Sequence, residues 1–500
     1  MRLAKALAMT TGEYDLFING TRRKAQEGRT IERTSPAHGV VVSRYACAGP
    51  GDLELAIASG RTAFDNGPWP TMRGADRAAV LLKVADLIDA RRELIATLDV
   101  LESGKPIAQA RGEIAGAADL WRYAAALARD LHGESYNTLG EGALGVVIRE
   151  PIGVVSIITP WNFPFLIVSQ KLPFALAAGC TAVVKPSEMT SASTLYLGEL
   201  LAEAGLPAGV ANILAGYGPE IGAPMTTDPR IDMVSFTGST RVGKAAMASA
   251  SATLKKVSME LGGKNPQIIF PDADMPAALD AALFGAFFNA GECCNAGSRI
   301  IVHEEIAESF QASFVEMAGK VPVGDPLDEN TKVGALISAQ HLAQVEGHVS
   351  AALNAGAALR LGGRRLDSSA GHFMAPTVLG GVRPEMGIAR DEVFGPVLAV
   401  LSFKTTDEAI ALANGVEYGL SASVWSRDFD TCMSVSRRLR AGTVWTNTFM
   451  DGAAELPFGG YRQSGLGREL GRNAVADYTE EKTLHLHCGP RTAWWLARSP

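Results

Sequence analysis

The chain has 500 residues, which is too long for one hydrophobic core and predicts two or three domains. Its composition, 47% hydrophobic and 20% charged, is typical of a soluble globular enzyme, and a net charge of −7 with both signs interspersed argues against nucleic acid or an anionic membrane as a partner. No apolar run approaches the roughly 18 residues of a spanning helix, and residues 1–10 do not resemble a signal peptide.

The cysteine pattern bears on the compartment and on metals. Six cysteines in a chain of this length are not a disulfide framework, and they fit a reducing cytoplasm. No spacing resembles a zinc site, since His485-Leu-His487-Cys488 is better explained by the alternation of a strand. We therefore expect a cytoplasmic protein without a bound metal.

The first part of the chain predicts helices. Residues 53–64, 77–98 and 107–131 carry Ala, Leu and Ile at spacings of three and four, separated by Asn66-Gly-Pro-Trp-Pro70 and Gly104-Lys-Pro106. A Gly-rich stretch then leads into Ala143–Arg149, which alternates like a strand and marks an expected domain boundary.

From residue 152 onward, short apolar strands alternate with helices. The predicted strands are 153–159, 181–185, 210–214 and 233–236, and the main helices begin at 164 and span 191–204. This βαβ alternation predicts a parallel doubly wound sheet, which binds ligands at the carboxyl ends of its strands. A second series, with strands near 267–270, 299–302, 397–403, 421–426 and 443–446, predicts a second α/β domain.

One strand end has features of a phosphate site. Met233–Phe236 runs into Thr237-Gly-Ser-Thr-Arg-Val-Gly-Lys-Ala245, where glycines allow the backbone to approach a pyrophosphate and a helix offers free N–H groups. The residues nearly match a P-loop, but Ala245 replaces the hydroxyl residue that would hold Mg²⁺, which counts against an NTPase. The G-x-G-x-x-G fingerprint is absent, because Gly216-Tyr-Gly218-Pro-Glu-Ile-Gly222 has one residue too many.

Another strand ends in Val183-Val-Lys-Pro-Ser-Glu188. A lysine and a carboxylate three residues apart can hydrogen-bond the hydroxyls of a ribose, although a surface ion pair explains them equally well. The acidic residue would also repel the 2′-phosphate of NADP.

Two adjacent cysteines, Cys293 and Cys294, follow an apolar helical run and lie between glycines in Phe287-Phe-Asn-Ala-Gly-Glu-Cys-Cys-Asn-Ala-Gly-Ser-Arg299. A thiol in such a turn is a candidate nucleophile. Taken alone, the pair is better interpreted as two small buried hydrophobic residues.

Seven motifs in this order resemble the NAD(P)-dependent aldehyde dehydrogenase superfamily of the non-acylating, hydrolytic type. They are Thr159-Pro-Trp-Asn-Phe-Pro164, Lys185-Pro-Ser-Glu188, Phe236-Thr-Gly-Ser-Thr-Arg-Val-Gly243, Met259-Glu-Leu-Gly-Gly-Lys-Asn-Pro266, the turn of Cys294, Glu392-Val-Phe-Gly-Pro-Val397 and Pro457-Phe-Gly-Gly-Tyr-Arg-Gln-Ser-Gly465. The resemblance extends from about residue 14 to about residue 485 and implies an α/β fold with two doubly wound Rossmann-like domains and a small β oligomerisation arm.

We accordingly expect three parts in the chain. An NAD-binding domain would comprise 1–130 and 152–258, and a catalytic domain 259–465. Residues 131–151 and 466–500 would form an oligomerisation or bridging segment and a tail.

The resemblance implies oxidation of an aldehyde to the carboxylic acid with NAD. Cys294 would form a thiohemiacetal, and hydride transfer would leave a thioester that water hydrolyses. Asn162 and the Cys294 backbone N–H would stabilise the oxyanion, and Glu260 would deprotonate the water, with its pKa raised by an apolar surrounding. The plainer interpretations are a turn-forming asparagine and an exposed strand glutamate.

One residue departs from the family pattern. Glu292 stands where the family usually has Gln, two residues before Cys294. If its carboxylate faces the thiol, it should raise the pKa of that thiol; the alternative is that it points to solvent.

The resemblance also implies a set of cofactor residues. Lys185 and Glu188 would bind the adenosine ribose, and the acidic Glu188 favours NAD over NADP. The full set is Ile158, Trp161, Lys185, Glu188, Gly218, Gly238, Ser239, Leu261, Glu392 and Phe394. Within it, Gly238, Ser239 and Trp161 would adjoin the pyrophosphate, while Glu392 and Phe394 would contact the nicotinamide ribose and ring.

The aldehyde and the assembly follow less directly. Phe163, Phe165, Gln170 and the loop Phe449–Glu455 are expected to line the aldehyde tunnel. Two acidic residues in that loop, with Glu292, favour a cationic aldehyde such as an aminoaldehyde or a betaine-type substrate. The strands Ala143–Arg149 and Thr483–His487 match the protruding pair of the family's oligomers and predict a homodimer or homotetramer, with the tail Trp494-Trp-Leu-Ala497 docked on a neighbouring subunit.

Two rival functions remain at this point. In a CoA-acylating enzyme, CoA would resolve the thioester, but the Met259–Pro266 motif with Glu260 favours water. A catalytically silent dinucleotide-binding protein of the same fold would not need Cys294, Glu260 and Asn162 together.

Overall fold

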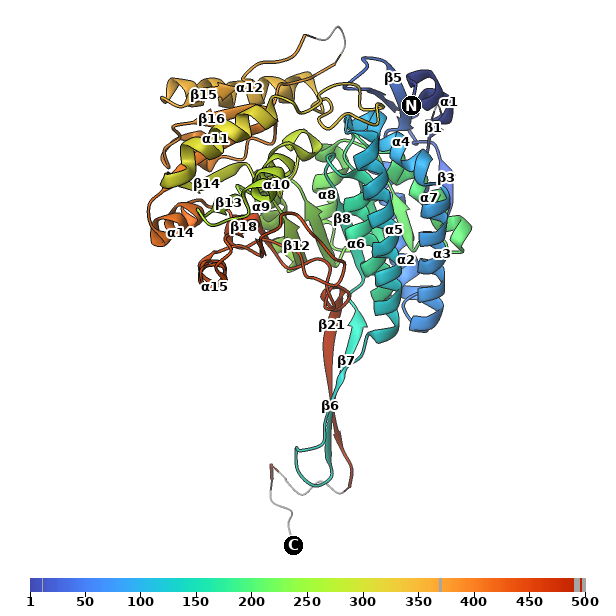
Figure 1. Ribbon diagram of the computed structural model, residues 1–500. Coiled ribbons are helices and arrows are strands. Elements are labelled where there is room, and N and C mark those ends of the chain that lie inside the picture. The colour runs from blue at the N-terminus through green and yellow to red at the C-terminus, as the bar shows by residue number, and fades with distance from the viewer. Residues whose placement is uncertain (11, 368–370, 490–494, 497–500) are drawn as a thin grey trace.

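Two large sheets, each with helices on both faces, form the body of the protein, and a slender three-stranded arm projects from it (Figure 1). The computed structural model describes residues 1–10, 12–367, 371–489 and 495–496. The predicted tail Trp494–Ala497 lies largely outside these described residues. A small sheet that the sequence did not predict, β1 (Glu13–Tyr14), β5 (Val41–Ala46) and β4 (Thr30–Thr34), lies near the N-terminus.

The first large sheet has the strand order β20-β12-β11-β8-β9-β10-β2-β3. Its five central strands are parallel, and the edge strands pair antiparallel. Along the chain the strands are β2 (Leu16–Ile18), β3 (Thr21–Arg23), β8 (Val154–Ile158), β9 (Thr181–Lys185), β10 (Ala211–Ile213), β11 (Met233–Thr237), β12 (Lys256–Glu260) and β20 (Gly465–Leu466). The strand order reverses beside β8, so the crevice at its carboxyl end is the expected ligand position.

The second sheet has the order β15-β16-β17-β14-β13-β18-β19 and is parallel except for β15. Its strands are β13 (Pro266–Ile269), β14 (Arg299–His303), β15 (Ala358–Leu361), β16 (Thr377–Gly380), β17 (Val397–Phe403), β18 (Ser421–Trp425) and β19 (Thr443–Thr446). The link from β12 to β13 joins the two sheets directly. That link places its own residues between the sheets.

Helices cover both faces of each sheet (Figure 1). Around the first sheet lie α2 (Pro50–Asn66), α3 (Gly74–Ala90), α4 (Arg92–Ser103), α5 (Ile107–Asp130), α6 (Pro164–Ala178), α7 (Ala192–Ala204) and α9 (Thr240–Ala250). Around the second lie α10 (Met275–Phe287), α11 (Glu304–Ala318), α12 (Ala339–Asn354), α14 (Thr406–Asn414) and α15 (Phe429–Arg438).

The single helix predicted over 77–98 is wrong, because the helix breaks at Arg91 into α3 and α4. Every residue from Ile95 to Ser103 is buried, and α4 contacts α1 (Leu3–Thr10), α5 and α7. A helix buried on all sides must turn into the interior, whereas α3 keeps an exposed face. The periodicity of the sequence does not record this change of direction.

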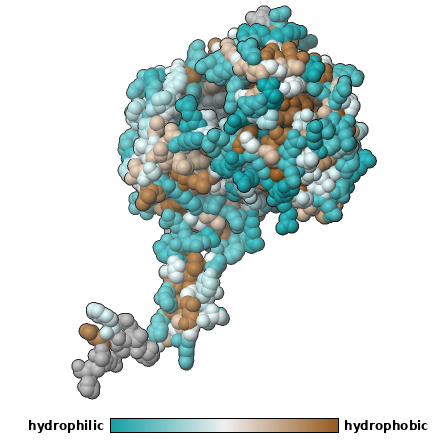
Figure 2. All heavy atoms as spheres, turned by 90° about the vertical axis from the view of Figure 1, so that its left-hand side faces the viewer, coloured by the Kyte–Doolittle hydropathy of each residue, from teal (hydrophilic) through white to brown (hydrophobic). Residues whose placement is uncertain are grey.

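The arm consists of β7 (Ala143–Pro151), paired antiparallel along its whole length with β21 (Thr479–His487), and the short β6 (Glu134–Tyr136). Both strands predicted here are present and are longer than expected. Apolar side chains lie exposed on the arm, among them Leu139, Leu484 and Leu486, and Figure 2 shows apolar atoms along it.

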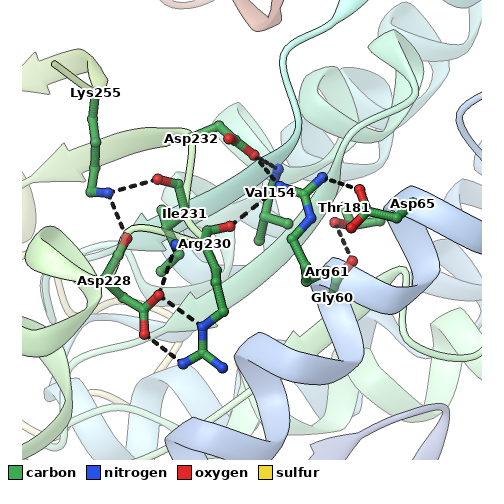
Figure 3. A network of polar contacts seen from close by, with 10 residues as sticks. All are labelled: Gly60, Arg61, Asp65, Val154, Thr181, Asp228, Arg230, Ile231, Asp232 and Lys255. Carbon is green, nitrogen blue, oxygen red and sulfur yellow. Dashed lines mark hydrogen bonds and ion pairs between the residues drawn. The ribbon is translucent and has the colours of Figure 1, made fainter. Parts of the chain in front are cut away.

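A polar network closes the end of the first sheet at the start of its parallel strands (Figure 3). Asp232 accepts hydrogen bonds from the Val154 backbone N–H at 2.7 Å and from Arg61 at 2.8 Å, while Lys255 donates to the Ile231 carbonyl at 2.7 Å. Gly153 has φ +135°, and a Cβ there would lie 1.8 Å from the Asp232 carboxylate. The network therefore fixes the start of β8 and leaves the opposite, carboxyl ends free for a ligand.

Candidate active site

Cys294 lies in a turn between α10 and β14 whose backbone is strained. Asn289 and Ala290 have φ of 52° and 55°, in the left-handed region that non-glycine residues rarely adopt. A Cβ on Gly291 would lie 2.1 Å from the Gly395 carbonyl oxygen. The turn therefore packs tightly against the segment that carries Glu392 and Phe394.

The two cysteines occupy different environments. Cys293 is 5% exposed and packs with Phe163, Ile167 and Ala296, whereas Cys294 is half-buried. Beneath the turn, the Asn265 side chain donates to the Cys294 carbonyl at 2.7 Å, and a Cβ on Gly263 would lie 2.6 Å from that same oxygen. The Gly-Gly-Lys-Asn stretch after β12 thus supports the Cys294 backbone.

A cavity of about 860 Å³ opens over Cys294. Glu260 and Glu469 also line it, and aromatic side chains form much of its wall: Phe163, Phe284, Phe288, Trp445 and Phe458. The thiol and the Glu260 carboxyl therefore face one space that is large enough for a small organic substrate.

Glu260, the last residue of β12, is 4% exposed, and neither of its carboxylate oxygens has a hydrogen-bond partner among the described residues. Burial raises its pKa well above the usual range, and the neighbouring Glu469 raises it further. Glu469 is paired with Lys171 of α6, whose ammonium also donates to Ser235 at 3.1 Å. Sequence reasoning missed Lys171 and Glu469. The available signal was the charged pair Arg468-Glu469, which begins three residues after the last motif.

Asn162 lies in the loop after β8 and is 3% exposed. Its side-chain N–H donates to the backbone carbonyl of Glu292 at 3.0 Å, and its backbone carbonyl accepts from the Lys105 ammonium at 2.7 Å. An amide has two N–H donors, so one stays available after the contact to Glu292. The structure therefore ties Asn162 to the turn of Cys294.

The pKa of the Cys294 thiol is raised well above its ordinary value. The contact with Cys293 is the largest cause, followed by burial and by the carboxyls of Glu392 and Glu260. Glu292 is not among the causes. Its carboxyl is 2% exposed and accepts from the Ile337 backbone N–H at 2.9 Å, so it faces neither the thiol nor solvent, and both alternatives drawn from the sequence are wrong.

The predicted cofactor residues gather at the carboxyl ends of the first sheet. Ile158 ends β8, Lys185 ends β9 and Leu261 follows β12. The Lys185 ammonium lies 3.6 Å from the Glu188 carboxylate. Gly238 follows β11, and Ser239 caps α9 by accepting from the Val242 N–H at 3.4 Å. A Cβ at Gly218 would meet nothing within 4 Å, which leaves that backbone open.

The remaining predicted cofactor residues lie across the crevice. Glu392 accepts from the Gly263 N–H at 3.1 Å, and desolvation raises its pKa to about 7. The rings of Trp161 and Phe394 meet edge to face at 5.4 Å. Glu392 and Phe394 thus approach the end of the first sheet from the second domain.

The tunnel residues are partly as expected. Phe163 and Gln170 line the cavity, as does Asp451. Phe165 does not, because it is fully buried in the core of the first sheet, and Glu292 and Glu455 are absent from the lining. Asp119 of α5 lines the cavity and was missed, because a single exposed carboxylate on a helix gives no signal in the sequence.

Known proteins resemble this chain over nearly its whole length. A family model described as the aldehyde dehydrogenase family matches residues 23–484. The betaine aldehyde dehydrogenase of Bacillus subtilis (strain 168) is 41% identical over 484 residues, which cover 96% of this chain and 99% of that protein. Aldehyde dehydrogenase family 2 member C4 of Arabidopsis thaliana is 42% identical over 479 residues, which cover 95% of each chain.

Solved structures give the same result. The NAD-dependent aldehyde dehydrogenase of Sinorhizobium meliloti superposes with a TM-score of 0.97 at 50% identity, covering 98% of each chain. The betaine aldehyde dehydrogenase of Staphylococcus aureus in complex with NAD⁺ has a TM-score of 0.97 at 36% identity, covering 99% of each. The α/β fold with Rossmann-like domains that the sequence predicted is confirmed.

Proposed function

The chain belongs to the aldehyde dehydrogenase family, and we propose that Cys294, Glu260 and Asn162 carry its reaction. It is an NAD-dependent enzyme that oxidises an aldehyde to the carboxylic acid, as predicted. The observation that supports the assignment best is the shared cavity. The half-buried Cys294 thiol and the buried Glu260 carboxyl, which has no hydrogen-bond partner among the described residues, face the same space. The side-chain amide of Asn162 donates a hydrogen bond to the turn that carries the thiol.

The reaction begins at Cys294. Its sulfur, once deprotonated, attacks the carbonyl carbon. The carbonyl oxygen becomes an oxyanion, which accepts hydrogen bonds from the side-chain N–H of Asn162 and from the backbone N–H of Cys294. The oxyanion then returns its electron pair as the C–H bond breaks, which leaves a thioester on Cys294. NAD, when bound, supplies the acceptor for that hydride.

Glu260 acts in the second half. Its carboxylate takes a proton from water, the resulting hydroxide attacks the thioester carbon, and the carboxylic acid leaves as the Cys294 thiolate is restored. A pKa raised by burial and by the charge of Glu469 suits this base, because a more basic carboxylate removes the proton of water more readily. Lys171 holds Glu469 in position beside it.

The crevice fits the dinucleotide chemically. Lys185 and Glu188 offer a donor and an acceptor to the ribose hydroxyls, and the start of α9 at Ser239 offers N–H groups to a pyrophosphate. The open backbone at Gly218 leaves room for it, whereas a Cβ at Gly238 would lie 2.7 Å from the Phe236 ring, so only glycine fits there. Glu392 and Phe394 would hold the nicotinamide ribose and ring, and Ile158, Trp161 and Leu261 would line the rest. A preference for NAD over NADP is supported by the carboxylate of Glu188.

For the substrate, we propose a cationic aldehyde. The support is now the carboxylates of Asp119 and Asp451 on a wall rich in aromatic rings, since both groups favour a cation. The names of two relatives are consistent, the betaine aldehyde dehydrogenase above and aminoaldehyde dehydrogenase 2 of Zea mays, 40% identical over 96% of each chain. Higher kcat/KM for aliphatic or aromatic aldehydes than for aminoaldehydes would remove this proposal.

The assembly, the division into parts and the compartment are also proposals. The arm, with exposed leucines on an isolated sheet, supports a homodimer or homotetramer built through it. Residues 1–130 with 152–258 and residues 259–465 would be the cofactor and catalytic domains. No helix among the described residues is long and apolar enough to cross a membrane. A cytoplasmic location would keep the Cys294 thiol reduced.

The roles are tested by NADH formation across an aldehyde panel with wild-type, Cys294→Ala, Cys293→Ala and Glu260→Gln proteins. We expect Cys294→Ala to abolish activity and Cys293→Ala to retain it. Glu260→Gln should form one equivalent of NADH rapidly and then turn over slowly. Activity in Cys294→Ala together with loss in Cys293→Ala would refute the choice of nucleophile.

A further inference from the structure

Glu292 joins three segments that meet at the site. Its side chain accepts from the Ile337 N–H at 2.9 Å, and its carbonyl accepts from the amides of Asn162 at 3.0 Å and Asn289 at 2.9 Å. Ile337 is held from its other side by Arg33, which donates to the Ile337 carbonyl at 3.0 Å. The carboxyl of Glu292 thus fixes the turn of Cys294 to the segment that precedes α12.

His341 continues this contact toward the cofactor side. Its Nε2 lies 3.6 Å from the Glu292 carboxyl and donates to the Phe394 carbonyl at 2.7 Å. The ring also meets Trp161 edge to face at 5.6 Å. The backbone of His341 is anchored in the first turn of α12, where its N–H donates to Ser338 at 3.1 Å. A single imidazole therefore contacts the loops of Trp161, Glu292 and Phe394.

The buried surroundings favour the neutral form of each partner. Burial raises the pKa of Glu292 well above its usual range and lowers that of His341. The charged groups that face them, Lys105 and Arg33 near Glu292 and His348 near His341, do not reverse these directions. A neutral Glu292 can fulfil the hydrogen-bonding role of a glutamine and adds no charge beside the thiol that must ionise.

We propose that Glu292 and His341 are positioning residues that form one buried link, which holds the Cys294 turn in register with the Glu392–Phe394 segment. The inference rests on the proposed function, in which Cys294 presents the hydride donor and Phe394 adjoins the acceptor. A displacement of about 1 Å between the two would be costly, because hydride transfer needs the reacting atoms in near-contact geometry.

The test compares Glu292→Leu, His341→Leu and their double variant, with NAD and a good aldehyde substrate. We expect each single change to lower kcat/KM for NAD by about tenfold. The double change should also lower it by about tenfold, because both substitutions remove the same interaction and their effects are then not additive. A deuterated aldehyde should show a larger isotope effect on kcat in the variants than in wild type. Glu292→Gln, which keeps an acceptor for Ile337, should restore values within about twofold of wild type.

His348→Leu is the matched control, because this half-buried histidine lies on the same helix and its charge acts on His341, yet no hydrogen bond or ion pair among the described residues joins it to Glu292 or Phe394. It should stay within about twofold of wild type. Wild-type kinetics in both leucine variants, or a strictly multiplicative hundredfold loss in the double variant, would overturn the link.

The Cys294→Ala variant, measured in parallel, separates the two proposals. Activity in Cys294→Ala refutes the choice of nucleophile. Loss of activity in Cys294→Ala, together with wild-type kinetics of the leucine variants, refutes only the link. If Glu292→Leu does not fold, His341→Leu with its isotope effect decides alone.

Discussion

The chemistry of individual residues in this protein depends on how each is buried. Cys293 and Cys294 are neighbours in the chain and both line the cavity, yet Cys293 is buried among apolar side chains whereas Cys294 is half-buried. The carboxyls of Glu260 and Glu392 have raised pKa values because burial removes water that would stabilise their charge. The Cys294 thiol and these two carboxyls therefore titrate at a higher pH than the same residues in solution.

A first prediction concerns the thiol. Because the pKa of Cys294 is raised, alkylation of the cofactor-free enzyme by iodoacetamide should remain slow at neutral pH and rise steadily above pH 9. Since contact with Cys293 is the largest cause, Cys293→Ala should shift this rise to lower pH. Rates measured by mass spectrometry of the Cys294 peptide check this, and an unchanged profile in Cys293→Ala would contradict it.

A second prediction concerns cofactor binding. The pKa of Glu392 is raised to about 7, so the carboxyl is mostly protonated below that pH and ionised above it. Only the carboxylate accepts hydrogen bonds from both ribose hydroxyls, so KM for NAD should fall by about tenfold from pH 6 to pH 8. Glu392→Gln should have a high KM that varies little over that range. Parallel pH profiles for the two proteins would show that another group titrates.

At the scale of elements, the candidate active site is held by segments whose backbone is locally unfavourable. The turn of Cys294 contains two left-handed non-glycine residues and a left-handed Gly291 pressed against Gly395. Such strain persists only where surrounding contacts compensate for it, and here these come from Asn162, Asn265 and Ile337. The turn is therefore a product of the packing between the two sheets.

Two glycines with similar backbones allow a matched test of that packing. Gly291 has φ +73° with a carbonyl oxygen 2.1 Å from a would-be Cβ, whereas Gly205 has φ +88° with nothing within 4 Å. Gly205→Ala should lower the free energy of unfolding by about 1 kcal/mol and leave kcat unchanged. Gly291→Ala should cost about 2–3 kcal/mol and lower kcat at least about tenfold. Denaturant unfolding and NADH assays distinguish these outcomes, and equal effects would refute the tight contact.

At the scale of the whole molecule, the chain has a body that contains the candidate site and an arm that stands apart from it (Figures 1 and 2). The arm buries little of its own surface, because Leu484 and Leu486 of β21 are 37% and 44% exposed. An isolated sheet of this size with an apolar face is stable only when another surface covers it. We attribute that role to a second copy of the chain.

The fourth prediction tests this assembly. Leu484→Lys with Leu486→Lys should lower the mass measured by light scattering, because charges on the covered face oppose association. His485→Lys, on the opposite face of the same strand, should leave the mass unchanged. A wild-type protein that is monomeric at micromolar concentration, or a double variant with the wild-type mass, would contradict the proposal.

The sequence by itself determined the family, the α/β fold and the reaction class, because these are written in local patterns: strand–turn–helix alternation, glycines beside a phosphate site, and a thiol, an amide and a carboxyl in ordered motifs. It also placed Glu188, whose charge bears on the cofactor. Such features need only neighbours in the chain to be recognised.

Only the tertiary structure decided where the side chains point and what they meet. Several features depend on segments far apart in the chain. They are the direction of the Glu292 side chain, the helix break at Arg91, the burial of Phe165, the approach of Glu469 and Lys171 to Glu260, and the position of the Asp119 carboxylate in the cavity. The physical reason is that burial and charge coupling are properties of the assembled interior. No residue carries them in its own sequence neighbourhood.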